Sequence, residues 1–167
     1  MTKRHPDFKH MLPWLVIALV IVVLDQATKL LVLERFKPGG FLQVTPFFDL
    51  VLVYNKGAAF SFLASADGWQ TPLLVVIAVG AITIVFWMLW RNAGRLLLQT
   101  GLALILGGAI GNLIDRIAYG KVVDFLLFHA YGWSFPAFNV ADSAITVGAA
   151  ILILEGFMTP KPAGETT

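Results

Sequence analysis

Two aspartates in strongly apolar sequence are the residues of this 167-residue chain best placed to do chemistry. Asp124 lies in VVDF at 122–125, and Asp142 lies in FNVADS at 138–143. A charge at the centre of a membrane helix costs about 2.5–3.5 kcal/mol, so an unpaired carboxylate there calls for a role. Two carboxylates held close in a poorly solvated site cannot both ionise, so they share a proton. One could then take a proton from water while the other gives one to an amide, although an ion pair or a proton relay would use the same residues.

Other nucleophiles are poorly represented near these aspartates. His5 and His10 lie in the N-terminal tail and His129 lies in a segment between apolar spans. A Ser-His-Asp triad or a histidine metal site therefore lacks its histidines. The chain has no cysteine, which excludes a thiol nucleophile. We expect neither a metal nor another cofactor.

A Ser-Lys dyad is the remaining alternative for hydrolysis. Ser61 or Ser143 could be paired with Lys29, but Lys29 follows Asp25 by four residues. This spacing places the two charges on one helix face in the favourable acid-first order. Asp25 and Lys29 are therefore expected to form a structural ion pair, and the carboxylate pair remains the stronger candidate.

Composition assigns the chain to the integral membrane class. Hydrophobic residues make up 58% and charged residues 13% of the sequence, and the mean hydropathy is +0.81. A soluble globule of this composition would have too little polar surface. The net charge is +2 and the basic residues are scattered, so the sequence carries no electrostatic footprint for nucleic acid.

Four apolar segments are long enough to cross a hydrocarbon core, which requires about 20 residues. They cover residues 12–33, 71–90, 96–118 and 138–158. No small-x-small cleavage site follows the first segment, so it is interpreted as a retained anchor rather than a removable leader. The sequence therefore predicts one integral membrane domain over 1–167, an all-α bundle of four transmembrane helices.

The distribution of lysine and arginine predicts the orientation of these spans. Six basic residues lie in the two tails and in the short link after the second span, against four in the two longer connections on the opposite side. The first group is Lys3, Arg4, Lys9, Arg91, Arg95 and Lys161, and the second is Arg35, Lys37, Lys56 and Lys121. Both termini are expected in the cytoplasm, with the long connections outside.

The two outer connections differ in character. The segment 36–69 contains FFDLVLVY at 47–54, which is β-branched and aromatic and ends in the turn residues NKG. It predicts a small β-sheet, between helices one and two, that lies on the membrane surface as a cradle. The segment 119–137 is expected to be a loop, and its Tyr131, Trp133 and Phe135 suggest a cover for that sheet.

The polar residues of the spans gather at the outer level. Four stretches contribute, with Asp25 and Lys29, then Asn112, Asp115 and Arg116, then Asp124, and then Asn139 and Asp142. Asn112 and Arg116 share a helix face and fit structural or substrate-positioning roles equally well, while Asp115 could be solvated or paired. The small residues GGAIG at 107–111 would let the third span approach another helix closely.

Five sequence blocks, in order, resemble the motifs of the bacterial lipoprotein signal peptidases (signal peptidase II). They are DQATK at 25–29, NKGAAFS at 55–61, GAIGNLIDR at 108–116, VVDF at 122–125 and FNVADS at 138–143. The resemblance covers nearly the whole chain apart from the tails. Five blocks in order are highly specific.

The resemblance implies an aspartic endopeptidase of the bacterial inner membrane that removes signal peptides from prolipoproteins, cutting before a diacylglyceryl-modified cysteine at the outer leaflet. It implies that Asp124 and Asp142 are catalytic. The residues that it places around the substrate are Asn55, Asn112, Arg116 and Asn139, and those that it leaves in structural support are Asp25, Lys29, Gly57 and Gly108. The implied partners are the diacylglyceryl-prolipoprotein, membrane lipids and globomycin-type inhibitors, and a monomer is expected.

Two other classes of function use the same residues. A small proton- or ion-coupled transporter could use Asp25, Asp124 and Asp142 as a relay, but the acids gather on one side and no inverted repeat is evident. A noncatalytic scaffold that binds lipidated partners would use the same cradle. The scaffold predicts that Asp→Asn variants keep full function.

Overall fold

A computed structural model describes residues 8–57 and 69–158 of the chain. Four long helices are present in this part: α1 (Phe8–Arg35), α2 (Gln70–Arg91), α3 (Leu96–Tyr119) and α4 (Val140–Met158). Each is long and apolar enough to cross a membrane. The prediction of four spans is confirmed. Five residues named in the sequence analysis lie outside the described residues: Lys3, Arg4, His5, Ser61 and Lys161. Lys9 is described.

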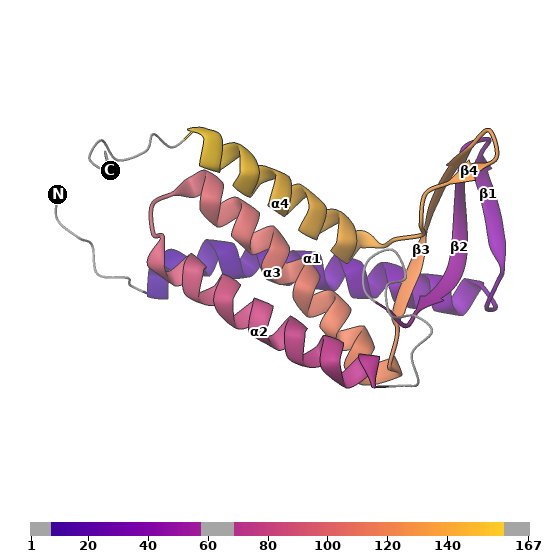
Figure 1. Ribbon diagram of the computed structural model, residues 1–167, viewed down its shortest axis with the longest axis horizontal. Helices are drawn as coiled ribbons and strands as arrows, with labels where there is room; N and C mark the ends of the chain where they lie inside the picture. Colours follow the sequence, from indigo (N-terminus) through magenta and orange to yellow (C-terminus); the bar gives the residue numbers. More distant parts are fainter. Residues whose placement is uncertain (1–7, 58–68, 159–167) are drawn as a thin grey trace, which may run out of the picture.

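The helices lie side by side and the sheet caps one end of the bundle (Figure 1). The first residue of α1, the last residue of α4 and the turn between α2 and α3 are all at the opposite end (Figure 1). Large apolar side chains such as Leu19, Val76 and Ile153 are more than half exposed. Such outward-facing side chains suit contact with lipid tails rather than water.

Helix α3 is the central helix and packs against the other three. Glycine allows this close packing on two sides. A Cβ on Gly107 would lie 2.7 Å from the carbonyl oxygen of Ala18 on α1, and a Cβ on Gly108 would overlap the carbonyl oxygen of Ala141 on α4. The small surface predicted at 107–111 therefore lies where α1, α3 and α4 come together.

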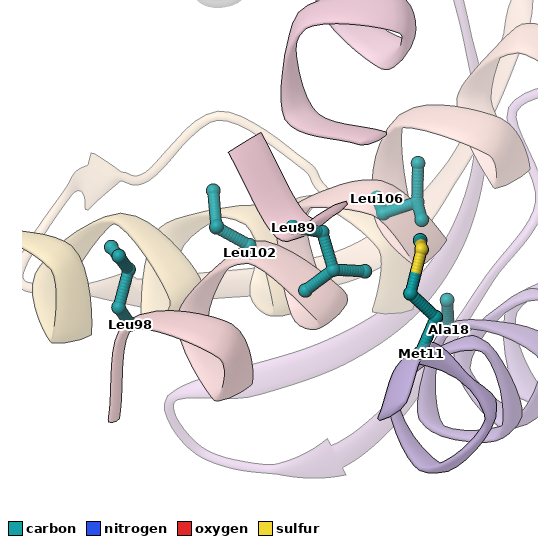
Figure 2. Close-up of a cluster of buried hydrophobic side chains, with 6 residues drawn as sticks. All are labelled: Met11, Ala18, Leu89, Leu98, Leu102 and Leu106. Atoms are coloured by element: carbon teal, nitrogen blue, oxygen red, sulfur yellow. The ribbon is translucent and has the colours of Figure 1, made fainter. Parts of the chain in front are cut away.

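Apolar clusters hold the two ends of the molecule. The larger cluster lies between α1, α2 and α3, away from the sheet, and Figure 2 shows its members, Met11, Ala18, Leu89, Leu98, Leu102 and Leu106. A second cluster joins the end of α1 to the sheet and consists of Val32, Leu52, Val123 and Phe125. The second cluster fixes the sheet on the bundle because it removes apolar area of both α1 and the sheet from the surface.

The sheet has four antiparallel strands in the order β1-β2-β3-β4. Strands β1 (Phe41–Thr45) and β2 (Phe48–Asn55) lie in the predicted outer segment. Strands β3 (Val122–Ala130) and β4 (Trp133–Ser134) come from 119–137, so the prediction that this segment is a loop over the sheet was wrong. The apolar, partly β-branched run after Gly120 forms β3 because it pairs with β2 and its first four residues are buried.

Helix α4 begins at Val140 rather than at the predicted residue 138. Phe138 is held by β3 instead, since its backbone N–H donates to the carbonyl oxygen of Leu126 at 3.1 Å and the Leu126 N–H donates back at 2.8 Å. Asn139 follows as the residue that caps the helix. The chain thus changes from strand pairing to helix just before Asp142.

Candidate active site

Asp142 is positioned by a reciprocal capping arrangement at the start of α4. The backbone N–H of Asp142 donates to Oδ1 of Asn139 at 2.9 Å, and the Asn139 N–H donates to Oδ2 of Asp142 at 3.3 Å. This is the pattern of a capping box, in which the first and fourth residues satisfy each other's free N–H groups. Asp25 on α1 accepts a further free N–H, that of Ala141, at 2.9 Å. The local sequence therefore holds the Asp142 carboxylate in the first helical turn.

Asp124 is positioned by β3. It lies opposite Val53 of β2 in the antiparallel ladder and is 2% exposed. The preceding residue is anchored to the bundle, because the Val123 N–H donates to Oδ2 of Asp115 at 3.0 Å. The strand thus places Asp124 beside the ends of α3 and α4 that face the sheet.

Asn139 connects the two aspartates. Its Nδ2 donates to Oδ1 of Asp124 at 2.7 Å, while its backbone N–H contacts Asp142. Asn112 of α3 donates from Nδ2 to Oδ1 of Asp142 at 2.8 Å, and Asn55 of β2 donates to the Asp124 carboxylate. The structure therefore brings together three of the four residues predicted around the substrate and surrounds both carboxylates with amide donors.

The electrostatic setting of Asp124 favours its protonated form. Burial, followed by the nearby Asp142 carboxylate, raises the pKa of Asp124 to about 7 from an ordinary value of 3.8. Hydrogen bonds from Asn55 and Asn139 and the charge of Lys29 oppose this rise. A carboxyl group with such a pKa can hold a proton near neutral pH beside a second carboxylate, which is the requirement for a shared-proton pair.

A closed polar cluster lies beneath the two aspartates. Nζ of Lys29 is 2.8 Å from Oδ2 of Asp25 and 2.9 Å from Oδ2 of Asp115, and it donates to Oδ1 of Asn112 at 3.2 Å. Gln26 donates to Oδ1 of Asp115 at 2.9 Å. The predicted Asp25–Lys29 ion pair is present. The sequence allowed Asp115 to be either solvated or paired, and the structure shows that it is buried and paired with Lys29.

Sequence reasoning missed Gln26 and the pairing of Asp115. A polar residue directly after Asp25 in an apolar span was a usable signal for Gln26. No local signal pointed to the contact between Lys29 and Asp115, because the two residues come from helices far apart in the chain. Gly111 lies where they meet, and a Cβ there would be 2.6 Å from Oδ2 of Asp25.

Arg116 and Gly57 lie at the edge of the site. The Arg116 guanidinium donates to the carbonyl oxygens of Asn112 and Gly57, both at 3.3 Å. The Gly57 N–H donates to Oδ1 of Asn55 at 2.9 Å, a local turn that orients the Asn55 amide. The guanidinium thus links the end of β2 to α3, and the roles predicted for these residues stay predictions.

The site opens on a cleft of about 620 Å³. Asn55, Asn112, Arg116 and Asp142 provide its polar groups. The remaining wall is mostly apolar and comes from α2, α3, α4 and the segment before α4; its members include Ala78, Ala109, Phe135, Phe138, Ile145 and Val147. A mostly apolar cleft with a few convergent polar groups suits a ligand that carries both a lipid-like part and a peptide bond.

Metal binding has no geometric support in the described part of the chain. Within residues 8–57 and 69–158, no group of three or more His, Cys, Asp or Glu residues is arranged to hold a metal ion. Asp25 and Asp115, which do approach each other, are already bridged by the ammonium of Lys29. The prediction that the protein works without a metal or cofactor stays a prediction.

Comparison with known proteins identifies the family. The pattern described as Signal peptidase (SPase) II matches residues 17–158. The "Lipoprotein signal peptidase" of Janthinobacterium sp. is 55% identical over 145 residues, which cover 87% of this chain and 88% of that protein. The protein of the same name from Burkholderia thailandensis is 52% identical over 143 residues, 86% of each.

Solved structures agree with the sequence relatives. A bacterial membrane enzyme determined at 2.3 Å resolution superposes with a TM-score of 0.79 at 29% identity, and the match covers 93% of this chain and 94% of that one. A second bacterial membrane enzyme structure gives a TM-score of 0.77 over 89% of this chain. The resemblance carried by the five motif blocks is confirmed, and this chain, a multi-pass membrane protein, belongs to the signal peptidase II family of peptidases.

Proposed function

We propose that this protein is an aspartic endopeptidase that removes signal peptides from bacterial prolipoproteins, cutting before the diacylglyceryl-modified cysteine. The observation that carries the proposal is the contact of one residue, Asn139, with both Asp124 and Asp142, the second of which lines a mostly apolar cleft. Two neighbouring carboxylates in a poorly solvated site can divide acid and base roles between them.

The contacts of each aspartate support a division of roles. Asp142 lies in the first turn of α4 and accepts N–H groups from Asn112 and Asn139. These N–H donors hold the Asp142 carboxyl group in the orientation from which it can accept a proton. Asp124, whose pKa burial raises to about 7, is suited to carry the shared proton.

The reaction then follows from proton transfer between these groups and water. Asp142 takes a proton from water as the water oxygen attacks the scissile carbonyl carbon, and Asp124 donates its proton to the carbonyl oxygen. When the tetrahedral gem-diol intermediate collapses, the carbon–nitrogen bond breaks, the proton held by Asp142 passes to the leaving nitrogen, and one hydroxyl of the gem-diol returns a proton to Asp124. Both carboxyl groups end the cycle with one proton between them.

We propose the bacterial inner membrane as the location, with both termini in the cytoplasm and the site at the outer leaflet. The ends of α1 and α4 lie at the same end of the bundle, opposite the sheet (Figure 1). Arg91 and Arg95 lie in the turn region between α2 and α3, at that same end. Basic residues on this side agree with the positive-inside rule. We propose action as a monomer, with membrane lipids around the bundle.

The direct test is cleavage of a purified diacylated prolipoprotein by the purified protein in lipid bicelles. We expect release of the signal peptide with the diacylglyceryl-cysteine at the new N-terminus, as measured by mass spectrometry. Globomycin should compete for the same cleft and stop cleavage. The matched control is the same prolipoprotein without its diacylglyceryl group. Failure to cut the lipidated substrate would refute the proposal.

The transporter and the scaffold are tested by different measurements. The buried charged side chains of the described residues, Asp25, Lys29, Asp115 and Asp124, gather at one end of the bundle instead of forming a path through it, which argues against transport. Proton or ion flux in proteoliposomes that Asp124→Asn abolishes would favour the transporter. Unchanged function in the Asp→Asn variants would favour the scaffold.

A further inference from the structure

The Lys29 ammonium is joined to the two-aspartate site through a single amide. An ammonium group has three hydrogens, and the Lys29 side chain, 3% exposed, contacts three acceptors: Oδ2 of Asp25, Oδ2 of Asp115 and Oδ1 of Asn112. The two carboxylates hold the ammonium in place. Its third contact leads toward the reactive pair.

The third contact determines which way the Asn112 amide faces. Lysine can only donate hydrogen bonds, so the group of Asn112 that faces Lys29 must be its oxygen. The Nδ2 group is then directed to Oδ1 of Asp142, at 2.8 Å. Asn139 reinforces this orientation by donating to the same Asn112 oxygen at 3.3 Å. The reversed amide would place an NH₂ group against the ammonium and an oxygen against a carboxylate.

We propose that Lys29 is a positioning residue for the reaction: it fixes the orientation of the Asn112 amide and thereby supplies the donor that holds the Asp142 carboxylate. This inference rests on the proposed function of Asp124 and Asp142. It assigns to the buried ion pair a role beyond joining α1 to α3. No ion pair joins Lys29 to Asp142 in the described part of the chain, so the hydrogen-bonded connection between them runs through Asn112. The Lys29 charge also acts on Asp124 at longer range.

A purely structural ion pair makes a different prediction, and Gln26 provides the matched control. Gln26 belongs to the same cluster, where it donates to Asp25, Asp115 and the Gly111 carbonyl. Among the described residues, Gln26 forms these three hydrogen bonds and none with Asn112. Loss of Gln26 therefore weakens the cluster without freeing the Asn112 amide, whereas loss of Lys29 does both.

The experiment is a double-mutant cycle on the full chain, with a diacylated prolipoprotein as substrate and enzyme in excess so that slow rates are visible. We expect Lys29→Met to lower kcat about 10- to 100-fold with KM changed less than about twofold, because a displaced catalytic group loses rate rather than binding. Asn112→Ala should lower kcat by at least as much. The combined Lys29→Met/Asn112→Ala variant should be no slower than Asn112→Ala alone, since both changes remove one interaction.

Gln26→Met, combined with Asn112→Ala, should instead show multiplied effects. Multiplied effects for the Lys29 pair, or a Lys29 defect seen only in KM, would overturn the inference. Lys29→Met leaves two buried carboxylates without a cation, so the cycle is repeated with Lys29→Met/Asp25→Asn, which removes one charge of each sign. If this charge-balanced variant has wild-type kcat, the inference is also overturned.

Failure of this inference is distinguishable from failure of the proposed function. Asp124→Asn and Asp142→Asn are measured in the same assay. Cleavage by these two variants would refute the aspartic mechanism itself. Their inactivity, together with multiplied effects in the Lys29 cycle, would refute only the positioning role.

Discussion

Four aspartates occupy neighbouring positions at the sheet end of the bundle, and they form two pairs with different surroundings. Asp25 and Asp115 are 0% and 1% exposed and share the ammonium of Lys29. Asp124 is also buried, at 2% exposure, yet it and Asp142 are contacted by amide and backbone N–H groups. Residue type is the same in the two pairs, whereas Asp142 is only partly buried and lines the cleft, and the chemical nature of the partners differs.

This difference separates structure from chemistry. The ammonium between Asp25 and Asp115 makes a short ion-pair contact with each and so joins α1 to α3. Amide donors satisfy the oxygens without neutralising the charge, so burial and mutual repulsion raise the pKa of Asp124. The first pair can therefore support the fold, while the second can hold and release a proton.

The largest expected effect is on the amide-contacted pair. Asp124→Asn and Asp142→Asn should each lower the rate of cleavage by about 10³-fold or more, because an asparagine cannot exchange the shared proton and acid–base groups contribute about 10²- to 10⁴-fold each. Both variants should remain folded, since asparagine is nearly isosteric. Single-turnover cleavage and thermal melting measure the two quantities. Substantial turnover by either variant would contradict the distinction.

The next effect is on the cation-paired aspartates. Asp115→Ala should lower the free energy of unfolding by about 3 kcal/mol, because it weakens a buried ion pair and leaves the Val123 N–H without its acceptor. Chemical denaturation in detergent measures this loss. A variant with wild-type stability and no turnover would instead place Asp115 with the reacting pair.

Asn139 caps α4 and contacts both aspartates of the proposed reactive pair, and two substitutions separate these contacts. Asn139→Ala should lower kcat about 10- to 100-fold and destabilise α4 by about 1 kcal/mol. Asn139→Ser can still cap the helix but cannot reach Asp124 with an N–H group. It should therefore recover most of the stability with little gain in kcat. Full recovery of both would mean that the amide contact with Asp124 is unimportant.

The pH dependence of stability offers a smaller test. The pKa of Asp124 is raised to about 7 in the folded protein against 3.8 in the reference state. Its contribution to stability is therefore fully present below about pH 4 and is lost as the pH rises to about 7. The melting temperature of the wild type should fall across this range more steeply than that of Asp124→Asn. Parallel curves would show that Asp124 does not titrate there.

The smallest effect is expected at the end of the bundle away from the sheet. Arg95 on the surface forms an ion pair with Glu155 of α4, and its side chain is 45% exposed. Arg95→Ala should change stability by less than about 1 kcal/mol and leave cleavage unaltered, since exposed pairs are weak. A loss as large as that of Asp115→Ala would remove the contrast between buried and exposed pairs.

Much of the fold could be predicted because the relevant signals are local. A run of about 20 apolar residues predicts a span wherever it occurs, and the spacing of Asp25 and Lys29 predicts their ion pair without knowledge of other helices. Strand β3 was missed because Asp124 interrupts an apolar run between two spans. Its pairing with β2 depends on a partner about seventy residues away in the sequence.

The sequence by itself determined the membrane class, the four spans, the family motifs and the identity of the two candidate aspartates. Only the tertiary structure decided which aspartates share a lysine and which share amides. The physical reason is that Lys29, Asp115, Asn112 and Asp142 come from three helices, and their contacts exist only where the glycines of α3 let those helices approach. Charge partners across helices are set by packing, which no local spacing encodes.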